Sequence, residues 1–294
     1  MRNSLPSKPV EIVIFEIFIS HICYLRTDHG GGKVTASLDT LLDTAHRLAN
    51  AASEVTLSHF RKNAAADHKG GGLFDPVTAA DKGAETAMRD ILARDFPDHG
   101  IVGEEFGAMN AGADFVWTLD PIDGTRAFIL GMPLWGTLIG LQRQGKPLLG
   151  LMDQPFIGER FWNDDRAAWY RGPKGLQRCE TRACAGLGEA LLTATSPDMF
   201  EGGDEARFNR LAKAVRMRRF GGDCYAYCML ALGQIDIVAE AQLKPFDIVP
   251  LIPIVEKAGG MVRSWDGGPA KESGRCIACG DPALLEPALA LLKP

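Results

Sequence analysis

A short apolar strand that ends in two closely spaced aspartates constrains this chain more than any other feature. The run from Phe115 to Leu119 has the length and composition of a buried strand, and Asp120 and Asp123 follow it directly. Pro121 stiffens the exit, so both carboxylates lie on one tight turn. Carboxylates this close repel each other unless a cation lies between them. The segment therefore fits a site for Mg²⁺, a hard cation that prefers oxygen ligands.

The turn after Asp123 also offers backbone amides to an anion. Gly124 and Thr125 stand where the chain can enter a helical turn, and N–H groups at such a position bind phosphate. By itself, Asp-Pro-x-Asp-Gly is also a common solvent-exposed type I turn, in which the aspartates only cap the backbone. Other acidic segments are needed to separate these two interpretations.

Acidic side chains occur at two further points along the chain. Glu104 and Glu105 follow an apolar segment and a glycine, and Asp247 stands before the apolar helical positions of residues 248–258. A helix N-cap role would explain Asp247 alone, but not the other acidic clusters. We therefore favour one metal site that is formed by four distant acids: Glu104, Asp120, Asp123 and Asp247.

Hydrophobic periodicity predicts an α+β first half and an α/β second half. Ser37 is the expected N-cap of a first helix, and Pro97 ends a second helix that begins near Asp81. Gln144-Gly145 predicts a β-hairpin. The other predicted elements are strands at 115–119, 134–141, 148–152, 161–170, 191–194 and 235–239, and helices at 205–215, 223–232 and 247–258.

Residues 1–36 are expected to form an N-terminal extension outside the fold. Their apolar stretch, residues 10–24, contains Glu11 and Glu16 and is shorter than the roughly 20 residues of a membrane span. It also lacks a strongly basic start and a clear cleavage site, so neither a membrane anchor nor a signal peptide is expected. An early start codon would explain the extension, and an amphipathic strand or docking helix is the alternative. A mobile loop is expected at residues 64–74.

Charge and cysteine content narrow the functional class. The 294-residue chain has a net charge of -5, so no basic field for nucleic acid is expected, and an anionic substrate would need metal ions or local basic groups. The seven cysteines lack the spacing of a disulfide framework, and Cys276 and Cys279 form a lone CxxC without the partners of a zinc site. We expect reduced thiols and a cytoplasmic enzyme.

Four segments together resemble the signatures of the inositol monophosphatase family. They are Asp75-Pro-Val-Thr-Ala-Ala-Asp81, Glu104-Glu105, the run Asp120–Thr125, and Phe246-Asp247 followed by Glu256–Gly260. Phe246 replaces the tryptophan of many members, which is a conservative change. The resemblance covers about residues 37–290 and implies a layered αβαβα sugar-phosphatase fold. We expect an α+β metal-binding domain at 37–185, an α/β domain at 186–294 that completes the cleft, and a homodimer.

The resemblance also implies a Mg²⁺-dependent phosphomonoesterase that acts on a small phosphorylated substrate. Two or three ions would be held by five residues: Glu104, Asp120, Ile122 (through its carbonyl), Asp123 and Asp247. Thr125, paired with Asp81, would orient the attacking water, Glu104 would take part in catalysis, and Gly124 with Thr125 would bind phosphate. Because metal ions neutralise a phosphate dianion and stabilise the developing charge, no covalent phosphoenzyme is needed.

The leaving-group pocket is predicted from the second half of the chain. Segments 221–227 and 240–247 resemble the histidinol-phosphatase branch more closely than inositol phosphatases. The ammonium and imidazole of histidinol phosphate would suit carboxylates, and Asp223 and Glu240 are the candidates. Asp223 as a helix N-cap and Glu240 as a charge on the rim are the alternatives. The complete set of predicted substrate contacts is Asp123, Asp223, Glu240 and Asp247.

These features predict hydrolysis of L-histidinol phosphate to L-histidinol and phosphate, a step of histidine biosynthesis. An inositol-1-phosphate or broad-specificity sugar-phosphate phosphatase is the alternative within enzymes. A catalysis-independent binding partner of the transcription or RNA-processing machinery is the alternative of another class. The intact set of acidic ligands argues against a scaffold that has lost catalysis.

Overall fold

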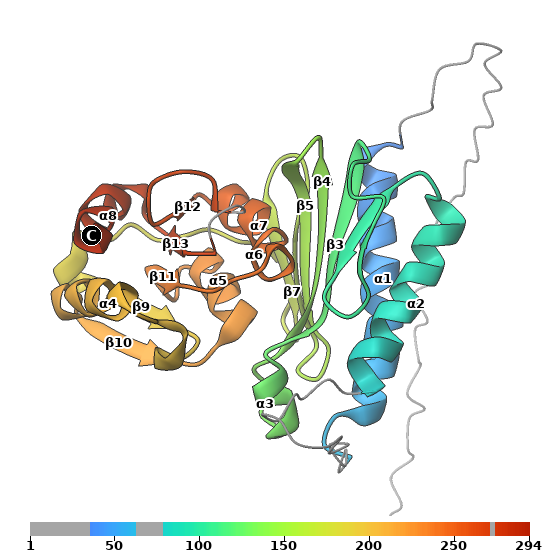
Figure 1. Cartoon of the computed structure of the whole chain (residues 1–294), viewed down its shortest axis with the longest axis horizontal. Helices are drawn as coiled ribbons and strands as arrows, with labels where there is room; N and C mark the ends of the chain where they lie inside the picture. Colours follow the sequence, from blue (N-terminus) through green and yellow to red (C-terminus); the bar gives the residue numbers. More distant parts are fainter. Residues whose placement is uncertain (1–35, 63–78, 271–273) are drawn as a thin grey trace, which may run out of the picture. The chain divides into compact units, whose positions relative to one another are not determined.

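The strands of the chain form two separate sheets, each with helices on both faces (Figure 1). Ala36–Pro294 form one compact unit. The computed structural model describes residues 36–62, 79–270 and 274–294. Three sequence-based expectations therefore lie wholly or mostly outside the described residues: the extension at 1–36, the loop at 64–74, and the first part of the segment 75–81.

The first sheet consists mainly of consecutive antiparallel strands. Its spatial order is β2-β1-β3-β4-β5-β6-β7-β8, and β1 runs parallel to β3. The predicted hairpin at Gln144-Gly145 is confirmed, because both residues have positive φ (50° and 70°) in the two-residue turn between β4 and β5. The strands are β1 (Gly100–Gly103), β2 (Gly107–Met109), β3 (Phe115–Asp123), β4 (Gly136–Arg143), β5 (Lys146–Gln154), β6 (Glu159–Asn163), β7 (Ala168–Gly172) and β8 (Gly175–Arg178).

The second sheet has five strands in the order β10-β9-β11-β13-β12. The strand β9 is parallel to both of its neighbours, β10 and β11, and β13 is antiparallel to β11 and β12. Cys276 and Cys279 both lie on β13, and the six cysteines in the described part of the chain are free thiols. The strands are β9 (Leu191–Ala194), β10 (Met217–Phe220), β11 (Ile237–Glu240), β12 (Met261–Ser264) and β13 (Cys276–Cys279).

The helices complete five layers, which confirms the predicted αβαβα fold (Figure 1). One pair covers the outer face of the first sheet: α1 (Leu38–His59) and α2 (Ala79–Asp95). Three lie between the sheets: α5 (Asp223–Ala231), α6 (Pro245–Ile248) and α7 (Leu251–Lys257). Another pair covers the outer face of the second sheet: α4 (Gly203–Ala214) and α8 (Leu285–Leu292). The short elements are α3 (Thr125–Ile129) and the 3₁₀ helices η1 (Leu187–Glu189), η2 (Pro197–Met199) and η4 (Pro282–Leu284).

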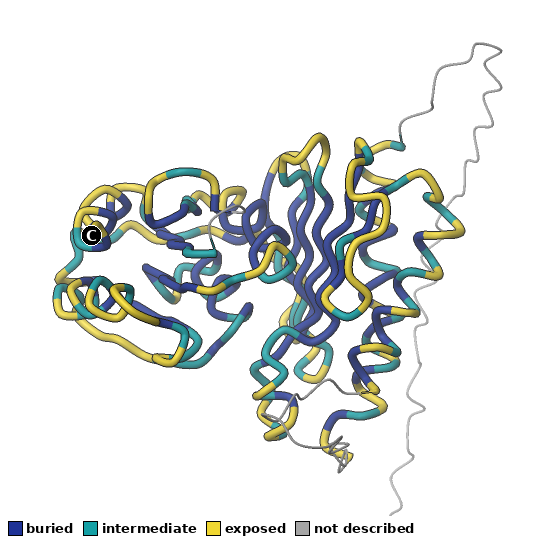
Figure 2. Tube along the Cα trace, viewed as in Figure 1, coloured by how far each residue is buried: buried dark blue, intermediate teal, exposed yellow. Residues whose placement is uncertain are grey.

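The strand β3 is buried along nearly its whole length (Figure 2). Trp117 and Leu119 pack in one cluster with side chains of α1 and α2, and each contributes roughly 2 kcal/mol or more through burial. Because strand side chains alternate, Asp120 points to the opposite face, toward α6. The apolar half of β3 thus fixes the strand in the core, and its end delivers an acid to the space between the layers.

The predicted start of the first helix is confirmed, whereas a predicted helix that contains Pro250 is interrupted there. Ser37 is the N-cap of α1, and its hydroxyl accepts from the Thr40 amide (3.1 Å), as predicted. The predicted continuous helix at 247–258 is wrong, because α6 ends before Pro250 and α7 begins after it. Proline lacks an N–H donor and its ring clashes with the preceding turn of a helix. Among the described residues, no helix is both long enough and apolar enough to cross a membrane.

Candidate active site

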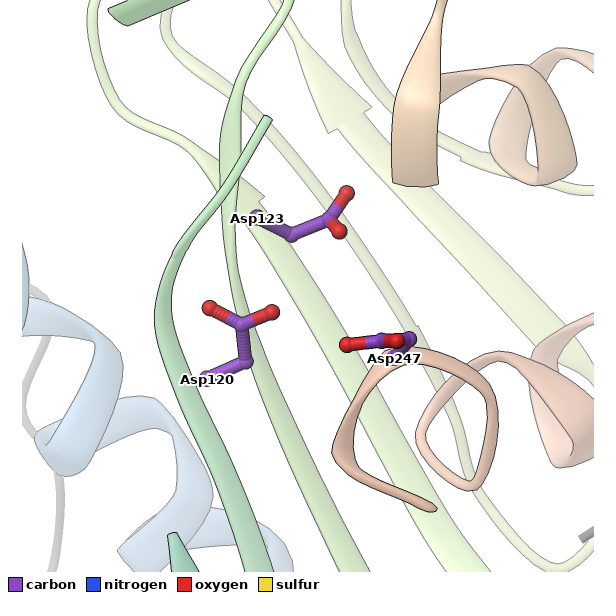
Figure 3. Close-up of side chains that lie close together, drawn as sticks. All are labelled: Asp120, Asp123 and Asp247. Carbon is purple, nitrogen blue, oxygen red and sulfur yellow. The ribbon is translucent and has the colours of Figure 1, made fainter. Parts of the chain in front are cut away.

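Three carboxylates from two distant segments converge where β3 ends (Figure 3). Asp120 and Asp123 belong to β3 and Asp247 belongs to α6, and one carboxylate oxygen of each lies within 4.8 Å of the others. Asp120 is only 1% exposed. The structure therefore brings together three of the four predicted acidic ligands. Closely packed, buried carboxylate oxygens are the donor set that a hard divalent cation requires.

An irregularity in β3 lets Asp120 and Asp123 face the same space. In a regular strand, two residues three positions apart point to opposite faces of the sheet. The pairing of β3 with β4 shifts register between these two aspartates, which turns Asp123 toward the cluster. The Thr137 hydroxyl donates to the Pro121 carbonyl (2.8 Å) and holds the irregular segment.

Backbone N–H groups orient each of the three carboxylates. Each bond uses one carboxylate oxygen, so the other oxygen remains for a further ligand. The helix N-termini of α5 and α6 supply two of the donors, which places their positive dipole ends beside the acids. The three bonds are Ile122 N to Asp120 Oδ1 (3.0 Å), Cys224 N to Asp123 Oδ2 (2.6 Å) and Lys244 N to Asp247 Oδ2 (2.7 Å).

The Asp247 bond also corrects an interpretation of the sequence. Asp247 is not the N-cap of its helix, because Lys244 occupies that position and Asp247 is the third residue of α6. Its carboxylate reaches back to the Lys244 amide, as an acidic residue does at this position in a capping box.

Glu104 joins the cluster from the end of β1. Its amide donates to the Leu119 carbonyl (3.1 Å), which continues the pairing of β1 with β3 up to the site. Its carboxyl is hydrogen-bonded to that of Asp120. Glu104 therefore adds a fourth acidic side chain to the cluster.

Burial and mutual repulsion raise the pKa values of the clustered acids. Burial raises the pKa of Asp120 well above its ordinary value, and the charge of Glu104 is the next cause. Burial and the charge of Asp223 likewise raise the pKa of Asp123 well above normal. Burial is the main cause that raises the pKa of Asp247 to about 7. The ionised forms thus lack a compensating positive charge, which a bound cation would supply.

The carboxylate cluster lines a pocket of about 230 Å³. Among the described residues that line it there is no lysine, arginine or histidine. All charged side chains that a phosphate dianion would meet there are acidic, so its binding requires added cations. Six of the lining residues are acidic: Glu104, Asp120, Asp123, Asp223, Glu240 and Asp247.

Glu240 lies in the pocket wall with its carboxylate fixed by three donors. Its Oε1 accepts from the amide and the hydroxyl of Thr195 (2.8 and 2.6 Å), and its Oε2 accepts from the Tyr227 hydroxyl (2.8 Å). Glu240 is 2% exposed, so the alternative of a charge on the rim is wrong. Its carboxylate still has acceptor capacity for a substrate donor.

Asp223 reaches the pocket from the first turn of α5. The N-cap of α5 is Gly222, so the alternative of Asp223 as N-cap is also wrong. Its carboxyl lies so close to Gly124 that a Cβ at that glycine would be 3.3 Å from Asp223 Cγ. Burial and the nearby Glu240 charge raise the pKa of Asp223 to about 6. Two acids therefore line the pocket in addition to the metal-ligand candidates.

The end of β3 and the turn after it contribute Ile122, Gly124 and Thr125 to the pocket lining. Gly124 has φ 86°, and a Cβ there would lie 2.9 Å from the Leu134 carbonyl oxygen, so only glycine fits. Thr125 is the first residue of α3, and its hydroxyl donates to the Ile122 carbonyl (3.0 Å). That carbonyl keeps a second lone pair, which the predicted metal contact would use.

Asp81 is buried in the first turn of α2 and is not among the residues that line the pocket. Together with burial, which is the larger cause, its charge raises the pKa of Glu105 to about 7. The predicted pairing of Asp81 with Thr125 stays a prediction, as do the catalytic roles of Asp81, Thr125 and Glu104.

Five further lining residues were not predicted from the sequence. Thr195 follows the apolar strand β9, and a polar residue at a strand end is a signal that could have identified it. Gln242 has φ 62°, a left-handed conformation in the segment that joins Glu240 to Asp247. The five are Thr195, Met199, Ala241, Gln242 and Leu243.

Comparisons with known proteins find relatives over most of the chain. A sequence model described as the inositol monophosphatase family matches residues 37–293. The "Bifunctional phosphatase IMPL2, chloroplastic" of Arabidopsis thaliana is 42% identical over 233 residues, which are 78% of this chain and 66% of that protein. The chain thus spans just under two thirds of that relative. A histidinol-phosphatase of Streptomyces coelicolor is 35% identical over 81% of this chain and 91% of its own length.

Solved structures show the same architecture. An inositol monophosphatase from Zymomonas mobilis has a TM-score of 0.80 at 42% identity, covering 88% of this chain and 99% of that one. An inositol monophosphatase from Anabaena has a TM-score of 0.74 at 29% identity, covering 87% of this chain and 96% of that one.

Proposed function

Because the chain belongs to the inositol monophosphatase family, a family of metal-dependent phosphatases, we propose that it is a Mg²⁺-dependent histidinol-phosphatase. The main support for this substrate is the composition of the pocket, which contains Asp223 and Glu240 in addition to the proposed metal ligands. Similarity to the histidinol-phosphatase of Streptomyces coelicolor supports the same choice.

The acids fit two or three Mg²⁺ ions. Three carboxylates within 4.8 Å of one another, all from buried or half-buried positions, offer hard oxygen donors and a surplus of negative charge. The proposed ligands are Glu104, Asp120, the Ile122 carbonyl, Asp123 and Asp247. When bound, the ions would neutralise the phosphoryl oxygens and make the attacking water more acidic.

The chain's own residues would orient the reactants and accept a proton from the attacking water. The backbone amides of Gly124 and Thr125 would hold phosphoryl oxygens at the start of α3, and the Thr125 hydroxyl would orient the attacking water. The Glu104 carboxylate, which lines the pocket, would accept the proton of that water. A second water would protonate the departing alcohol oxygen.

The leaving-group preference follows from charge. L-Histidinol carries an ammonium and an imidazole, whereas inositol is neutral, and both can form hydrogen bonds. A cation that enters a site with two buried carboxylates gains favourable Coulomb energy that a neutral polyol does not. Thr195 and Tyr227 favour the ionised form of Glu240, because their donated bonds lower a pKa that burial raises. Asp223 would pair with the ammonium and Glu240 with an imidazole N–H.

Steady-state phosphate release tests this proposal. With Mg²⁺ present, kcat/KM should be at least about 10-fold higher for L-histidinol phosphate than for inositol-1-phosphate or a hexose phosphate, since one favourable charge contact contributes about 1.4 kcal/mol. An equal or higher kcat/KM on inositol-1-phosphate would contradict histidinol phosphate as the preferred substrate. Activity that is unchanged after EDTA treatment and dialysis would contradict a metal-dependent mechanism.

We further propose a cytoplasmic homodimer that does not bind nucleic acid. Family resemblance supports the dimer, and the net charge of -5 supports the lack of nucleic-acid binding. Light scattering on the purified protein tests the dimer, since a mass near 32 kDa would instead indicate a monomer.

A further inference from the structure

The helix α5 is hydrogen-bonded to both sheets through two of its tyrosines. The Tyr225 hydroxyl donates to Glu159 Oε2 (2.5 Å) on β6 of the first sheet. The Tyr227 hydroxyl donates to Glu240 Oε2 (2.8 Å) on β11 of the second sheet. Residues two positions apart on a helix point in nearly opposite directions. The two phenols therefore fix α5 from opposite sides.

The chain approaches α5 in a conformation that needs such support. Gly221, Gly222 and Asp223 have consecutive positive φ values of 89°, 135° and 44°. The left-handed region costs a non-glycine residue such as Asp223 roughly 1 kcal/mol, and it persists only where surrounding contacts determine it. The first turn of α5 is therefore held by its contacts rather than by the intrinsic preference of its backbone.

That first turn delivers two groups to the active site. The Cys224 amide donates to Asp123 Oδ2 (2.6 Å), and the Asp223 carboxyl enters the pocket beside Gly124. Tyr225 is the next residue along the helix. A shift of this turn by a fraction of an ångström would move the Asp123 donor and the Asp223 carboxyl together.

Glu159 is suited to act as the fixed end of this connection. Its second oxygen, Oε1, accepts from the Tyr170 hydroxyl (2.6 Å) on the neighbouring strand β7. Both carboxylate oxygens are thus engaged, and the strand pairing of β6 with β7 holds the group in place. Neither Glu159 nor Tyr170 lines the active-site pocket, and the Tyr225 hydroxyl connects Glu159 to the first turn of α5.

We propose that Tyr225 is a positioning residue of the active site, whose bond to Glu159 holds the first turn of α5 so that the Cys224 amide orients Asp123. This inference rests on the proposed metal role of Asp123, but not on the identity of the leaving group. It predicts that loss of one phenolic oxygen outside the pocket weakens metal binding inside it.

Two matched substitutions test the proposal. Tyr225→Phe removes the phenol that connects Glu159 to α5, and Tyr170→Phe removes the other phenol on the same carboxylate without touching α5. For each variant, Mn²⁺ binding is measured by electron paramagnetic resonance without substrate, along with Tm and with kcat and KM on two phosphoesters. Tyr225→Phe should weaken Mn²⁺ binding and lower kcat/KM roughly 10-fold on both substrates, as loss of an outer partner of a metal ligand does. Tyr170→Phe should change Mn²⁺ affinity and kcat/KM by less than twofold. Its loss of Tm should be similar to that of Tyr225→Phe.

Several outcomes would overturn the proposal. Wild-type Mn²⁺ binding in Tyr225→Phe would do so, and so would equal losses in both variants. If Tyr225→Phe does not fold, Glu159→Gln keeps both tyrosines and offers a weaker acceptor, so an intermediate loss of Mn²⁺ affinity is expected and wild-type affinity would refute the role. Wild-type protein that neither binds Mn²⁺ nor hydrolyses a phosphoester would instead remove the proposed function itself.

Discussion

Replacing Asp120 by asparagine should abolish activity while stabilising the metal-free protein. Asp120 is fully buried, hydrogen-bonded to Glu104, and close to both Asp123 and Asp247. Without a cation, these acids destabilise the fold because their charges repel one another. Asparagine has nearly the same shape and keeps an oxygen that can accept from the Ile122 amide. The substitution therefore removes charge with little loss of packing.

The magnitude follows from the geometry of the cluster. Two unit charges 4.8 Å apart repel by about 3 kcal/mol at an effective dielectric constant of 20, and Asp120 has two such neighbours. Retained protons already relieve much of this repulsion, so we expect a net gain of about 1–3 kcal/mol in the free energy of unfolding. In a domain of this size that corresponds to a rise of about 2–10 °C in Tm.

Thermal unfolding with EDTA and with Mg²⁺ gives the decisive comparison. The wild-type Tm should rise with Mg²⁺. When the ion is at 100 times its Kd, binding adds about 2.7 kcal/mol to the free energy of unfolding. The Tm of Asp120→Asn should start higher and respond little, so the order of the two proteins reverses when Mg²⁺ is added. Loss of a ligand to the proposed ions should also lower kcat/KM by at least about 10³-fold, or 4 kcal/mol.

Asp153→Asn is the matched control for this experiment. Asp153 is equally buried, but it pairs with Arg160 (2.8 Å) away from the pocket. Its substitution should lower Tm, because Arg160 loses a charged partner, and leave kcat/KM within about threefold. A lower Tm for metal-free Asp120→Asn, or more than a tenth of wild-type activity, would refute the assignment of Asp120.

Three further predictions concern selectivity, pH and the second sheet. Asp223→Asn should lower kcat/KM for L-histidinol phosphate about 10-fold more than for inositol-1-phosphate, because only the former carries positive charge; parallel losses would exclude Asp223 from selectivity. The Asp247 carboxyl has a folded pKa of about 7 against an ordinary 3.8, so the stability that its proton provides is present below about pH 4. Urea unfolding in EDTA should show that this stability is lost as pH rises to 7, by at most about 1.4 kcal/mol per unit, and Mg²⁺ should reverse the trend. Asp236→Asn weakens two bonds from Arg182 (2.8 and 2.6 Å) and one from the Leu191 amide (2.8 Å), so unfolding should become easier by about 2–3 kcal/mol with kcat unchanged. A drop in kcat larger than threefold would contradict that purely structural role.

The carboxylate cluster could be predicted from sequence because its acids stand beside strong local signals. An apolar strand precedes Asp120, and a glycine and a proline mark its turn. What the sequence pattern could not supply was the register shift that turns Asp123 to the same side, since it depends on pairing with β4. The break at Pro250 could have been predicted, because a proline in a helix interior removes a hydrogen bond.

The contacts that fix the pocket side chains proposed to bind the leaving group were less predictable, because they join residues far apart in the chain. Glu240 and Thr195 are 45 residues apart in the chain and meet only because β9 and β11 are adjacent strands. Tyr225 and Glu159 are 66 residues apart and lie on different layers. No periodicity within a single segment encodes such pairs, and only the folded topology brings them together.

The pocket draws its two sets of acids from different parts of the topology. The proposed phosphate chemistry depends mainly on β3 and the turn that follows it, whereas Thr195, Asp223 and Glu240 belong to segments around the second sheet. The segment that carries Asp223 also supplies the amide that orients Asp123, so a substitution in α5 would disturb both sets of acids. Thr195 and Glu240 bond to each other on neighbouring strands instead. A change of preferred alcohol that spares catalysis is therefore expected from β9 and β11 rather than from α5.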